Sequence, residues 1–379
     1  MSEVARARLG AQRLVGRPFS GAAAAVGWLT AVQAQDYAGA KWALGLRTQD
    51  ATDARLDALF DAGDFLRTHV LRPTWHFVLP EDIRWLLDLT GPRVKVQLAA
   101  YDRREDVTRE LLAKSRRVLE AELGGGAQRT RPQLSAAVAR AGIRVTGPLV
   151  GRLLMHAELD GLIASGARQG RQHTHSLLDA RAPQARGRPR EEAVAELVRR
   201  YFTGHGPAQV QDCAWWSGLT MGDVRRGLAE AGSELVEERI DGRAYWRSPN
   251  APQPQVPLHT AHLLPNYDEF VVAYRDRSAA LDPARGFDLA PFPMGSILAH
   301  TVLLDGQVWG GWKRRRAGRE VVVELGPLDV LDAAAEAALE RAAEAFGRFL
   351  EMPVRLSPGF GPALPARARS RGAGGRRTD

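Results

Sequence analysis

The spacing of apolar residues changes from a helical to a strand period early in the chain. Residues 4–31 have the spacing of two helices, separated near Arg17-Pro18-Phe19-Ser20, with Ser20 as the expected N-cap. A third helix is predicted over residues 52–62. β-rich runs over residues 65–70 and 74–78 then predict a hairpin, and another helix follows from Pro80. Helices followed by a hairpin are the order of a winged helix.

The same order occurs twice more. Further helices are predicted over residues 110–123, 132–141, 148–159, 191–202, 207–216 and 221–231. Hairpins are predicted over residues 161–177 and 234–247, the second around the turn pair Asp241-Gly242. A segment rich in Pro, Gly and Arg over residues 182–189 has the composition of a linker. The three rounds predict three tandem winged helices.

Beyond about Pro252 the pattern is that of strands and turns. Strands are predicted over residues 258–264, 270–274, 297–304, 307–312, 320–325 and 354–356, with a helix over residues 331–349. These elements predict a small β domain with a capping helix, so the fold class is α+β. The expected domains are 1–125, 126–185 and 186–250 for the winged helices, 251–360 for the β domain and 361–379 for a disordered basic tail.

Charge and composition narrow the function classes. The formal net charge is +8. The five arginines and Asp379 of the tail account for +4, and the remaining +4 is compatible with a polyanionic partner. No run of about 18 apolar residues predicts a membrane span, and the N-terminus lacks the apolar core of a secretory signal. The single cysteine, Cys213, excludes an internal disulfide and is expected to be buried. We expect a cytoplasmic protein, associated with the nucleoid when bound to DNA.

Common catalytic motifs are missing from the sequence. His173 and His175 could share a strand face, but no carboxylate or thiol is placed to complete a metal site. No phosphate-binding glycine loop and no nucleophile elbow is present. We therefore expect neither a metal nor a cofactor.

Basic and aromatic residues interleave in the first hairpin and again near residues 309–316, a mixture that suits phosphate contact and base stacking. For Trp75 and Trp309, packing in the hydrophobic core is expected rather than contact with a nucleic acid. The third helix-turn-helix would place only Arg225 and Arg226 on its second helix, which is little for reading bases in a major groove.

A short Gln-rich motif lies between two predicted helices. Gln33 and Gln35 flank Ala34, and Asp36 follows. Taken alone, the motif fits two solvated glutamines in a turn.

A long motif far along the chain gives these glutamines another interpretation. Residues 264–278, Leu-Pro-Asn-Tyr-Asp-Glu-Phe-Val-Val-Ala-Tyr-Arg-Asp-Arg-Ser, resemble the LPxxDEYLLGYxDRS signature of the AlkZ-like winged-helix DNA glycosylases. Weaker matches occur in the same order over residues 32–35, 71–76, 214–220 and 302–314. The resemblance covers roughly residues 25–315.

The resemblance implies three tandem winged helices and a C-terminal β-barrel in a C-shaped DNA clamp. It implies hydrolysis of the N-glycosidic bond of bulky N7-alkylguanines and, in some members, the opening of interstrand crosslinks. Because bulky adducts are difficult to rotate into a closed pocket, we expect an open site without base flipping. The family motif is Gln-apolar-Gln or Gln-apolar-Asp, so Gln33 and Gln35 are the implied catalytic residues of the first branch, which resembles self-resistance enzymes of producers of alkylating antibiotics. Double-stranded DNA carrying alkylated guanine is the expected partner, and a monomer is the expected state. The candidate DNA contacts are Tyr37, Lys41, Trp42, His69, Arg72, His76, Asp268, Arg275, Arg277, Trp312, Lys313 and Arg314.

Two other hypotheses remain at this point. Helix-turn-helix units are typical of non-catalytic DNA-binding or regulatory proteins, and a multidomain scaffold for nucleic acids has the same composition. The Gln pair and the weakly basic recognition helix favour the glycosylase.

Overall fold

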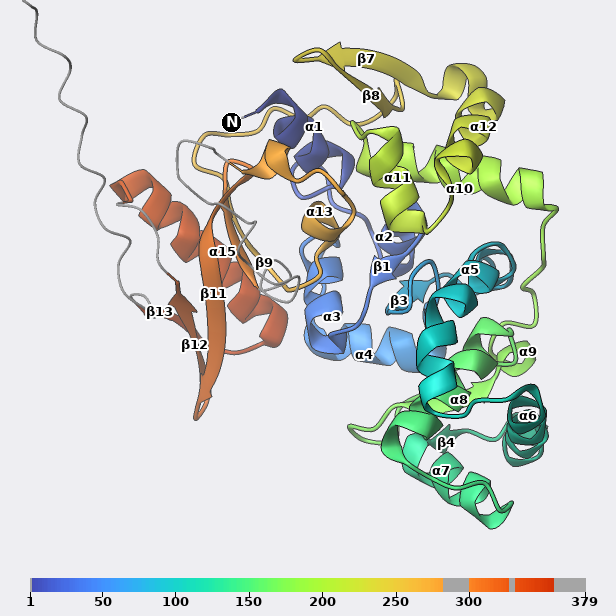
Figure 1. Cartoon of the computed structure of the whole chain (residues 1–379). Helices are drawn as coiled ribbons and strands as arrows, with labels where there is room; N and C mark the ends of the chain where they lie inside the picture. Colours follow the sequence, from blue (N-terminus) through green and yellow to red (C-terminus); the bar gives the residue numbers. More distant parts are fainter. Residues whose placement is uncertain (1, 282–299, 327–330, 358–379) are drawn as a thin grey trace, which may run out of the picture.

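The computed structural model describes residues 2–281, 300–326 and 331–357, which form a mixed α+β fold (Figure 1). The predicted tail over residues 361–379 lies outside the described residues, as do residues 297–299 of one predicted strand. No described helix is long and apolar enough to cross a membrane.

The first part of the chain surrounds a small sheet. Its helices are α1 (Glu3–Ala11), α2 (Ala22–Leu29), α3 (Tyr37–Gly45) and α4 (Asp53–Ala62). Its strands are β1 (Val32–Gln33), β2 (Leu66–His69) and β3 (Trp75–Val78), in the order β1-β3-β2. The hairpin and the helix after Thr52 are confirmed. The N-cap predicted at Ser20 is wrong, because α2 begins after Gly21 without a side-chain cap.

Two further groups of helices are each accompanied by a small antiparallel sheet. After α5 (Ile83–Arg104), the second group has α6 (Arg109–Leu123), α7 (Arg131–Arg140), α8 (Gly147–Leu159) and α9 (Leu178–Arg181), with β4 (Arg129–Thr130), β5 (Ile163–Ser165) and β6 (Thr174–Leu177). The third has α10 (Arg190–His205), α11 (Val210–Ser217) and α12 (Met221–Ala231), with β7 (Val236–Ile240) and β8 (Arg243–Arg247). Asp241 and Gly242 both have positive φ at the β7–β8 turn, as a tight hairpin of this hand requires.

The C-terminal part is a five-stranded sheet in the order β13-β12-β11-β10-β9. Its strands are β9 (Ala261–Leu264), β10 (Thr301–Leu304), β11 (Gln307–Ala317), β12 (Glu320–Leu325) and β13 (Val354–Ser357). Helix α15 (Ala333–Leu350) packs against β9 and β13. The expected closed barrel is not found within the described residues. There the sheet ends at β9 and β13, and its apolar residues are buried against α15 and α3, so they do not require closure.

One predicted strand is a helix instead. Residues 270–274 were expected to be extended, but α13 (Glu269–Val272) begins there because the Oδ1 atom of Asp268 accepts a hydrogen bond from the Phe270 N–H at 2.9 Å. An aspartate at this position caps the first turn of a helix. The apolar run that resembles a strand therefore forms one buried helical turn.

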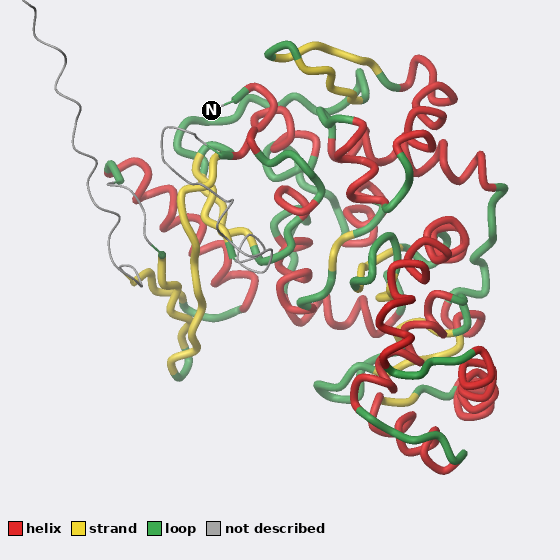
Figure 2. The backbone as a smooth tube through the Cα atoms, in the orientation of Figure 1, coloured by secondary structure: helices red, strands yellow, loops and turns green. Residues whose placement is uncertain are grey.

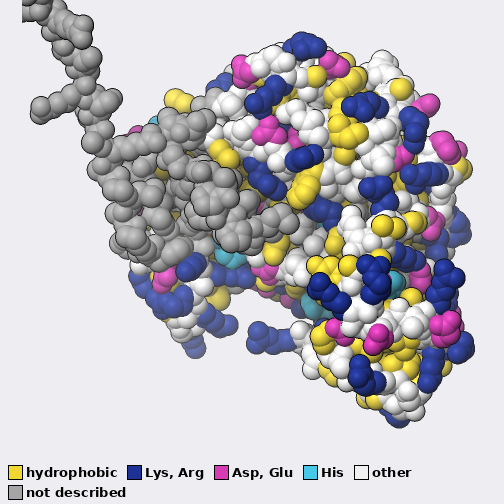
Figure 3. Space-filling view, in the orientation of Figure 1, with side chains coloured by type: hydrophobic (Ala, Val, Ile, Leu, Met, Phe, Trp, Pro, Cys, Tyr) yellow, Lys and Arg dark blue, Asp and Glu magenta, His cyan; other side chains and the backbone are white. Residues whose placement is uncertain are grey.

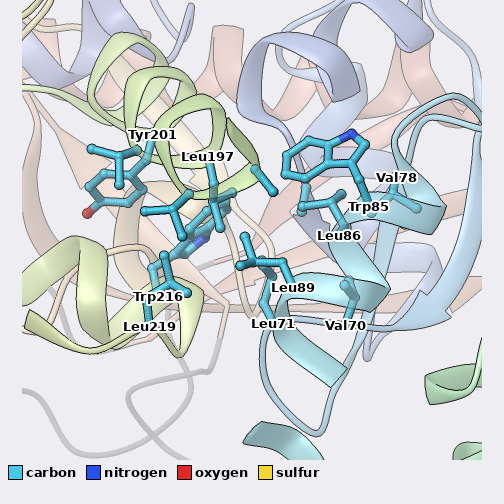
Figure 4. Close-up of a cluster of buried hydrophobic side chains, with 14 of the residues drawn as sticks. Val70, Leu71, Val78, Trp85, Leu86, Leu89, Leu197, Tyr201, Trp216 and Leu219 are labelled. Carbon is cyan, nitrogen blue, oxygen red and sulfur yellow. The ribbon is translucent and has the colours of Figure 1, made fainter. Parts of the chain in front are cut away.

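A large apolar cluster joins the first hairpin to the third group of helices (Figure 4). Val70 and Leu71, which directly follow β2, are buried in the same cluster as Trp85 and Leu89 of α5 and Leu197 of α10. Leu71 has a φ of 63°, a conformation that a β-branched or bulky residue rarely adopts without surrounding support. The packing of Leu71 fixes the backbone that leads into Arg72.

The outline of the molecule is concave on one side. Figure 2 shows the β11–β12 hairpin and the helical lobe of α6, α7 and α8 projecting on opposite sides of α4. In Figure 3, Lys and Arg side chains lie on both projections. Opposed positive surfaces of this kind favour a polyanion between them.

Candidate active site

The Gln-Ala-Gln motif is extended and paired with the first hairpin. Val32 lies opposite Phe77 and Gln33 lies opposite His76, and the Ala34 N–H donates to the Trp75 carbonyl at 2.7 Å. Gln33 is buried, with 5% of its surface exposed, whereas Gln35 is exposed. The segment is therefore the end of a strand rather than a solvated turn between helices.

Both ends of Gln33 are held by charged groups. Its Oε1 atom accepts a hydrogen bond from Nη2 of Arg72 at 2.7 Å. Its backbone N–H donates to Oε1 of Glu269 at 2.8 Å. The other carboxylate oxygen of Glu269 accepts a hydrogen bond from Nε1 of Trp216 at 2.8 Å. Glu269 is fully buried, so this carboxylate sets the position of Gln33 from inside the protein.

The neighbouring Asp268 anchors α13, the short helix that carries Glu269. Its two carboxylate oxygens accept hydrogen bonds from Nη1 and Nη2 of Arg47 at 2.9 and 2.8 Å. Arg47 uses its remaining donors on Gln12 and on the Ala43 carbonyl. All five N–H groups of this buried guanidinium are hydrogen-bonded, so its position is rigid. Arg47 therefore links α3, which follows the Gln motif, to the signature motif.

Gln35 has different surroundings. Its Oε1 atom accepts a hydrogen bond from the Trp75 backbone N–H at 3.4 Å, and its side chain lines a pocket of about 490 Å³. Gln33 is not among the residues that line this pocket. One glutamine is thus fixed in the protein interior, while the other faces a cavity open to solvent.

The two histidines of the first hairpin are buried. Nδ1 of His76 contacts the Thr74 carbonyl at 3.0 Å, and burial together with the charge of Arg72 holds the pKa of His76 well below its usual value. His69 is paired through Nδ1 with Glu158. His76 is therefore neutral at pH 7, and its burial removes it from direct contact with DNA on the surface.

Several other candidate DNA contacts also form ion pairs or hydrogen bonds within the protein. The buried ammonium group of Lys41 pairs with Asp53 at 2.8 Å and with Asp57 at 2.7 Å. The Tyr37 hydroxyl donates to Oδ1 of Asp57 at 2.9 Å. The indole N–H groups of Trp42 and Trp312, each 2% exposed, donate to the carbonyls of Leu263 and Leu264.

Burial corrects the DNA-binding role expected for Lys41, Trp42, Asp268 and Trp312. Each of these side chains is buried and paired inside the protein, so none reaches a surface on which a duplex could lie. Aromatic and charged residues in a sequence motif are as consistent with this internal role as with DNA contact.

The remaining basic candidates lie at or near the surface. Arg275 and Lys313 are exposed. Arg277 is partly buried and donates from Nε to the Val271 carbonyl at 3.1 Å, and Arg314 lies over the Phe346 ring at 5.7 Å. These positions leave all four as candidates for phosphate contact.

Three residues around the motif were not predicted from the sequence. Glu269 lies inside the signature motif, directly after Asp268, and this position was the one signal in the sequence that could have indicated a role at the site. Arg47 and Glu158 carry no local signal, because their partners are 221 and 89 residues away. Among the described residues, no group of three or more His, Cys, Asp and Glu side chains is arranged to hold a metal ion.

Comparison with known proteins places this arrangement in a family. The family model described as "DNA glycosylase AlkZ-like" matches residues 26–349, which include the Gln motif, Arg47, Arg72 and the signature. The chain belongs to this family. The AlkZ-like chain is also similar in structure to Streptomyces sahachiroi DNA glycosylase AlkZ, with a TM-score of 0.74 and 21% identity over 94% of this chain and 100% of that one. A search of curated proteins gave no match.

Family membership decides between the hypotheses that the sequence left open. The AlkZ-like protein is a DNA glycosylase, and DNA is its substrate. The non-catalytic DNA-binding protein and the scaffold are both less consistent with this family. The structural likeness, at 21% identity, supports the fold alone.

The position of Glu269 leads to a first prediction. A Glu269→Gln change leaves one acceptor oxygen for two donors, the Gln33 N–H and the Trp216 indole, and removes the negative charge near Arg72. Displacement of a group at a reacting centre by about 1 Å can cost 10²-fold in rate, so the hypothesis that Gln33 takes part in the reaction predicts that single-turnover excision of the modified base falls by about 10- to 100-fold. The measurement is the rate of abasic-site formation at a temperature where the variant is folded.

Trp216→Phe is the matched control for Glu269→Gln. It removes one hydrogen bond from the same carboxylate but keeps the bond to Gln33. Excision should then fall much less than in Glu269→Gln, even when the two variants are equally destabilised. Equal losses of rate in the two variants would assign Glu269 a role in stability alone.

Proposed function

We propose that this DNA glycosylase hydrolyses the N-glycosidic bond of bulky N7-alkylguanines in double-stranded DNA, with Gln33 and Gln35 as catalytic residues. The observation that carries the proposal is the fixed position of Gln33. Arg72 donates a hydrogen bond to its side-chain oxygen, and Glu269 accepts one from its backbone N–H. The hydrogen bond to Glu269 connects the Gln motif to the family signature. A neutral side chain whose position is fixed by two charged residues is typical of a preorganised reacting centre.

The chemistry requires no strong acid. Alkylation at N7 makes the purine cationic, so the base is already a good leaving group and needs no protonation. The enzyme must orient a water molecule and stabilise positive charge that develops on the sugar, as in other glycosyl transfers. A carbonyl oxygen has two lone pairs. One hydrogen bond from Arg72 to Gln33 and one from Trp75 to Gln35 leave an acceptor position on each amide.

A neutral amide also limits damage to normal DNA. Glutamine is a weak base, so it assists departure of a cationic base but does little for an unmodified one. Bulky adducts are difficult to rotate into a closed pocket. We therefore propose that the adduct stays in its groove, without base flipping, while the duplex lies in the concave side between the two basic projections (Figure 3).

The fold and biological context belong to the same proposal. The three helical groups with their small sheets are consistent with three winged helices that position the duplex. A monomer suffices, because both glutamines come from one chain. Resistance to a DNA-alkylating natural product is the proposed role, and opening of interstrand crosslinks through N7 of guanine would use the same chemistry.

The test uses duplexes that each contain one N7-alkylguanine of graded bulk, from methyl to large aromatic substituents. After incubation, heating in base cleaves the strand wherever an abasic site has formed. We expect cleavage at the modified guanine with the bulky adducts and none in an unmodified duplex. Tight binding without cleavage of any adduct would contradict the proposal and support a different damaged base as the substrate.

A further inference from the structure

A pocket of about 490 Å³ is built directly onto the Gln motif. Gln35 lines it, and the backbone of Ala34 is held by two other wall residues. The Ala34 carbonyl accepts a hydrogen bond from Nε of Arg67 at 3.0 Å, and the Ala34 N–H donates to the Trp75 carbonyl at 2.7 Å. A volume of this size lies within the range of about 300–1,000 Å³ that is typical of small-molecule sites.

The opposite wall comes from the second group of helices. Gly151, Leu154 and Met155 of α8 line the pocket, together with residues just before and within β6. The pocket thus lies between the first hairpin and a segment that begins more than 50 residues later in the sequence, at Arg131. Gln35 connects it to the reacting centre.

The polar lining of the pocket is organised around one buried carboxylate. Glu158, 2% exposed, contacts Nδ1 of His69 and lies 3.5 Å from Nε2 of His175. Burial alone would raise the pKa of Glu158, but the charge of His69 and hydrogen bonds from His175 and His69 hold it below its usual range. The Nδ1 atoms of His173 and His175 are buried and have no hydrogen-bond partner among the described residues. Neither atom has accessible surface, so the hydrogen-bond donors open to a ligand in the pocket are the guanidinium groups of its lining.

The rest of the lining suits an apolar group with hydrogen-bond acceptors. Trp75, Leu154 and Met155 provide apolar surface. The Arg67 guanidinium lies 4.3 Å from the centre of the Trp75 ring, and Arg131 and Arg152 also line the pocket. Burial and the charge of Arg67 lower the pKa of His173 to about 4, so this ring is neutral at pH 7. Three guanidinium groups and one carboxylate line the pocket, and this excess of positive charge disfavours a cationic ligand.

We propose that this pocket binds the substituent carried by the alkylated guanine and that it selects a ring-containing, mainly apolar group with a carbonyl acceptor. The inference rests on the proposed function, because it assigns a second subsite to the same substrate. The modified base stays stacked and reacts at the glutamines, while its substituent projects from N7 on the major-groove side into the pocket beside Gln35. Specificity for bulk then comes from this pocket rather than from the glutamines.

Gly151 allows the pocket to be filled without removing any of its polar groups. A Cβ atom at Gly151 would lie 3.1 Å from Nη2 of Arg131, the far end of a flexible side chain. Leucine also favours a helix interior more than glycine does, so Gly151→Leu is expected to fold. Gly147→Leu, on the same helix, is the matched control, because a Cβ there meets nothing within 4 Å and Gly147 does not line the pocket.

The first experiment compares two duplexes, one with N7-methylguanine and one with N7-(4-carbamoylbenzyl)guanine. We expect Gly151→Leu to lower excision of the benzyl adduct, relative to the methyl adduct, by about tenfold or more, as loss of an apolar subsite does. Gly147→Leu should keep the wild-type ratio. An unchanged ratio in Gly151→Leu would overturn the pocket assignment, even if both adducts are excised.

A second experiment does not depend on catalysis. Binding of free 4-methylbenzamide to the whole protein is followed by saturation-transfer NMR. We expect binding to the wild type and to Gly147→Leu, and loss of the signal in Gly151→Leu. Binding without excision of either adduct would keep the pocket and overturn the proposed function, whereas excision of both adducts without binding of the probe would overturn the pocket.

Discussion

Replacing Gln33 and Gln35 together with alanine is expected to abolish excision of N7-alkylguanine while leaving the affinity for abasic DNA nearly unchanged. Both amides lose the oxygen that would orient water or face the developing positive charge. Removal of a single preorganised group at a reacting centre typically costs about 10²–10³-fold in rate, so the double change should reduce excision to background. Single-turnover formation of abasic sites measures the rate, and a tetrahydrofuran-containing duplex measures the affinity.

The two single changes should differ in their side effects. Gln33→Ala removes the side-chain partner of the partly buried Arg72, which costs stability on the order of 1 kcal/mol. Gln35→Ala removes an exposed side chain and should leave the melting temperature unchanged. Gln49→Ala is the matched control, because Gln49 is an exposed glutamine outside the site. Excision that survives in the double variant would show that other residues carry the reaction.

Asp268→Ala is expected to cost about 3–5 kcal/mol in the free energy of unfolding, the largest effect on stability that we predict. The change leaves the fully buried Arg47 guanidinium without its negative partner and removes the N-cap of α13. Denaturant unfolding monitored by circular dichroism measures the loss. Because α13 carries Glu269, excision should also fall at temperatures where part of the protein remains folded.

Two controls separate the buried ion pair from charge removal in general. Glu120→Ala breaks the exposed pair with Arg116 and should change stability by no more than about 0.5 kcal/mol. Asp268→Asn keeps an acceptor for the Phe270 N–H but not the charge, so it should be less stable than wild type and more stable than Asp268→Ala. A loss in Asp268→Ala no larger than that in Glu120→Ala would contradict a structural role for the Arg47–Asp268 pair.

Local sequence signals predicted the helices, the hairpins and the family. Helices that begin at a good cap and carry one apolar face, such as α4 after Thr52, are specified locally. Hairpins such as β7–β8 are specified by a turn pair with the required conformation. The sequence failed at residues 270–274, where an apolar run favours a strand but the cap at Asp268 begins a helix. The β1 pairing was also missed, since a two-residue strand leaves no periodic signal.

The packing of distant segments separates the candidate residues that lie at the site from those that support the fold. Trp42, Trp312 and Asp268 occur in motifs that suggest DNA contact, yet all three are buried. Glu269 meets Gln33 across 236 positions of sequence, and Glu158 meets His69 across 89. The physical reason is that a side chain's role depends on its partners and its burial, and both are set by packing between distant segments. Local propensity reports neither, so the sequence could name the glutamines but not the groups that hold them.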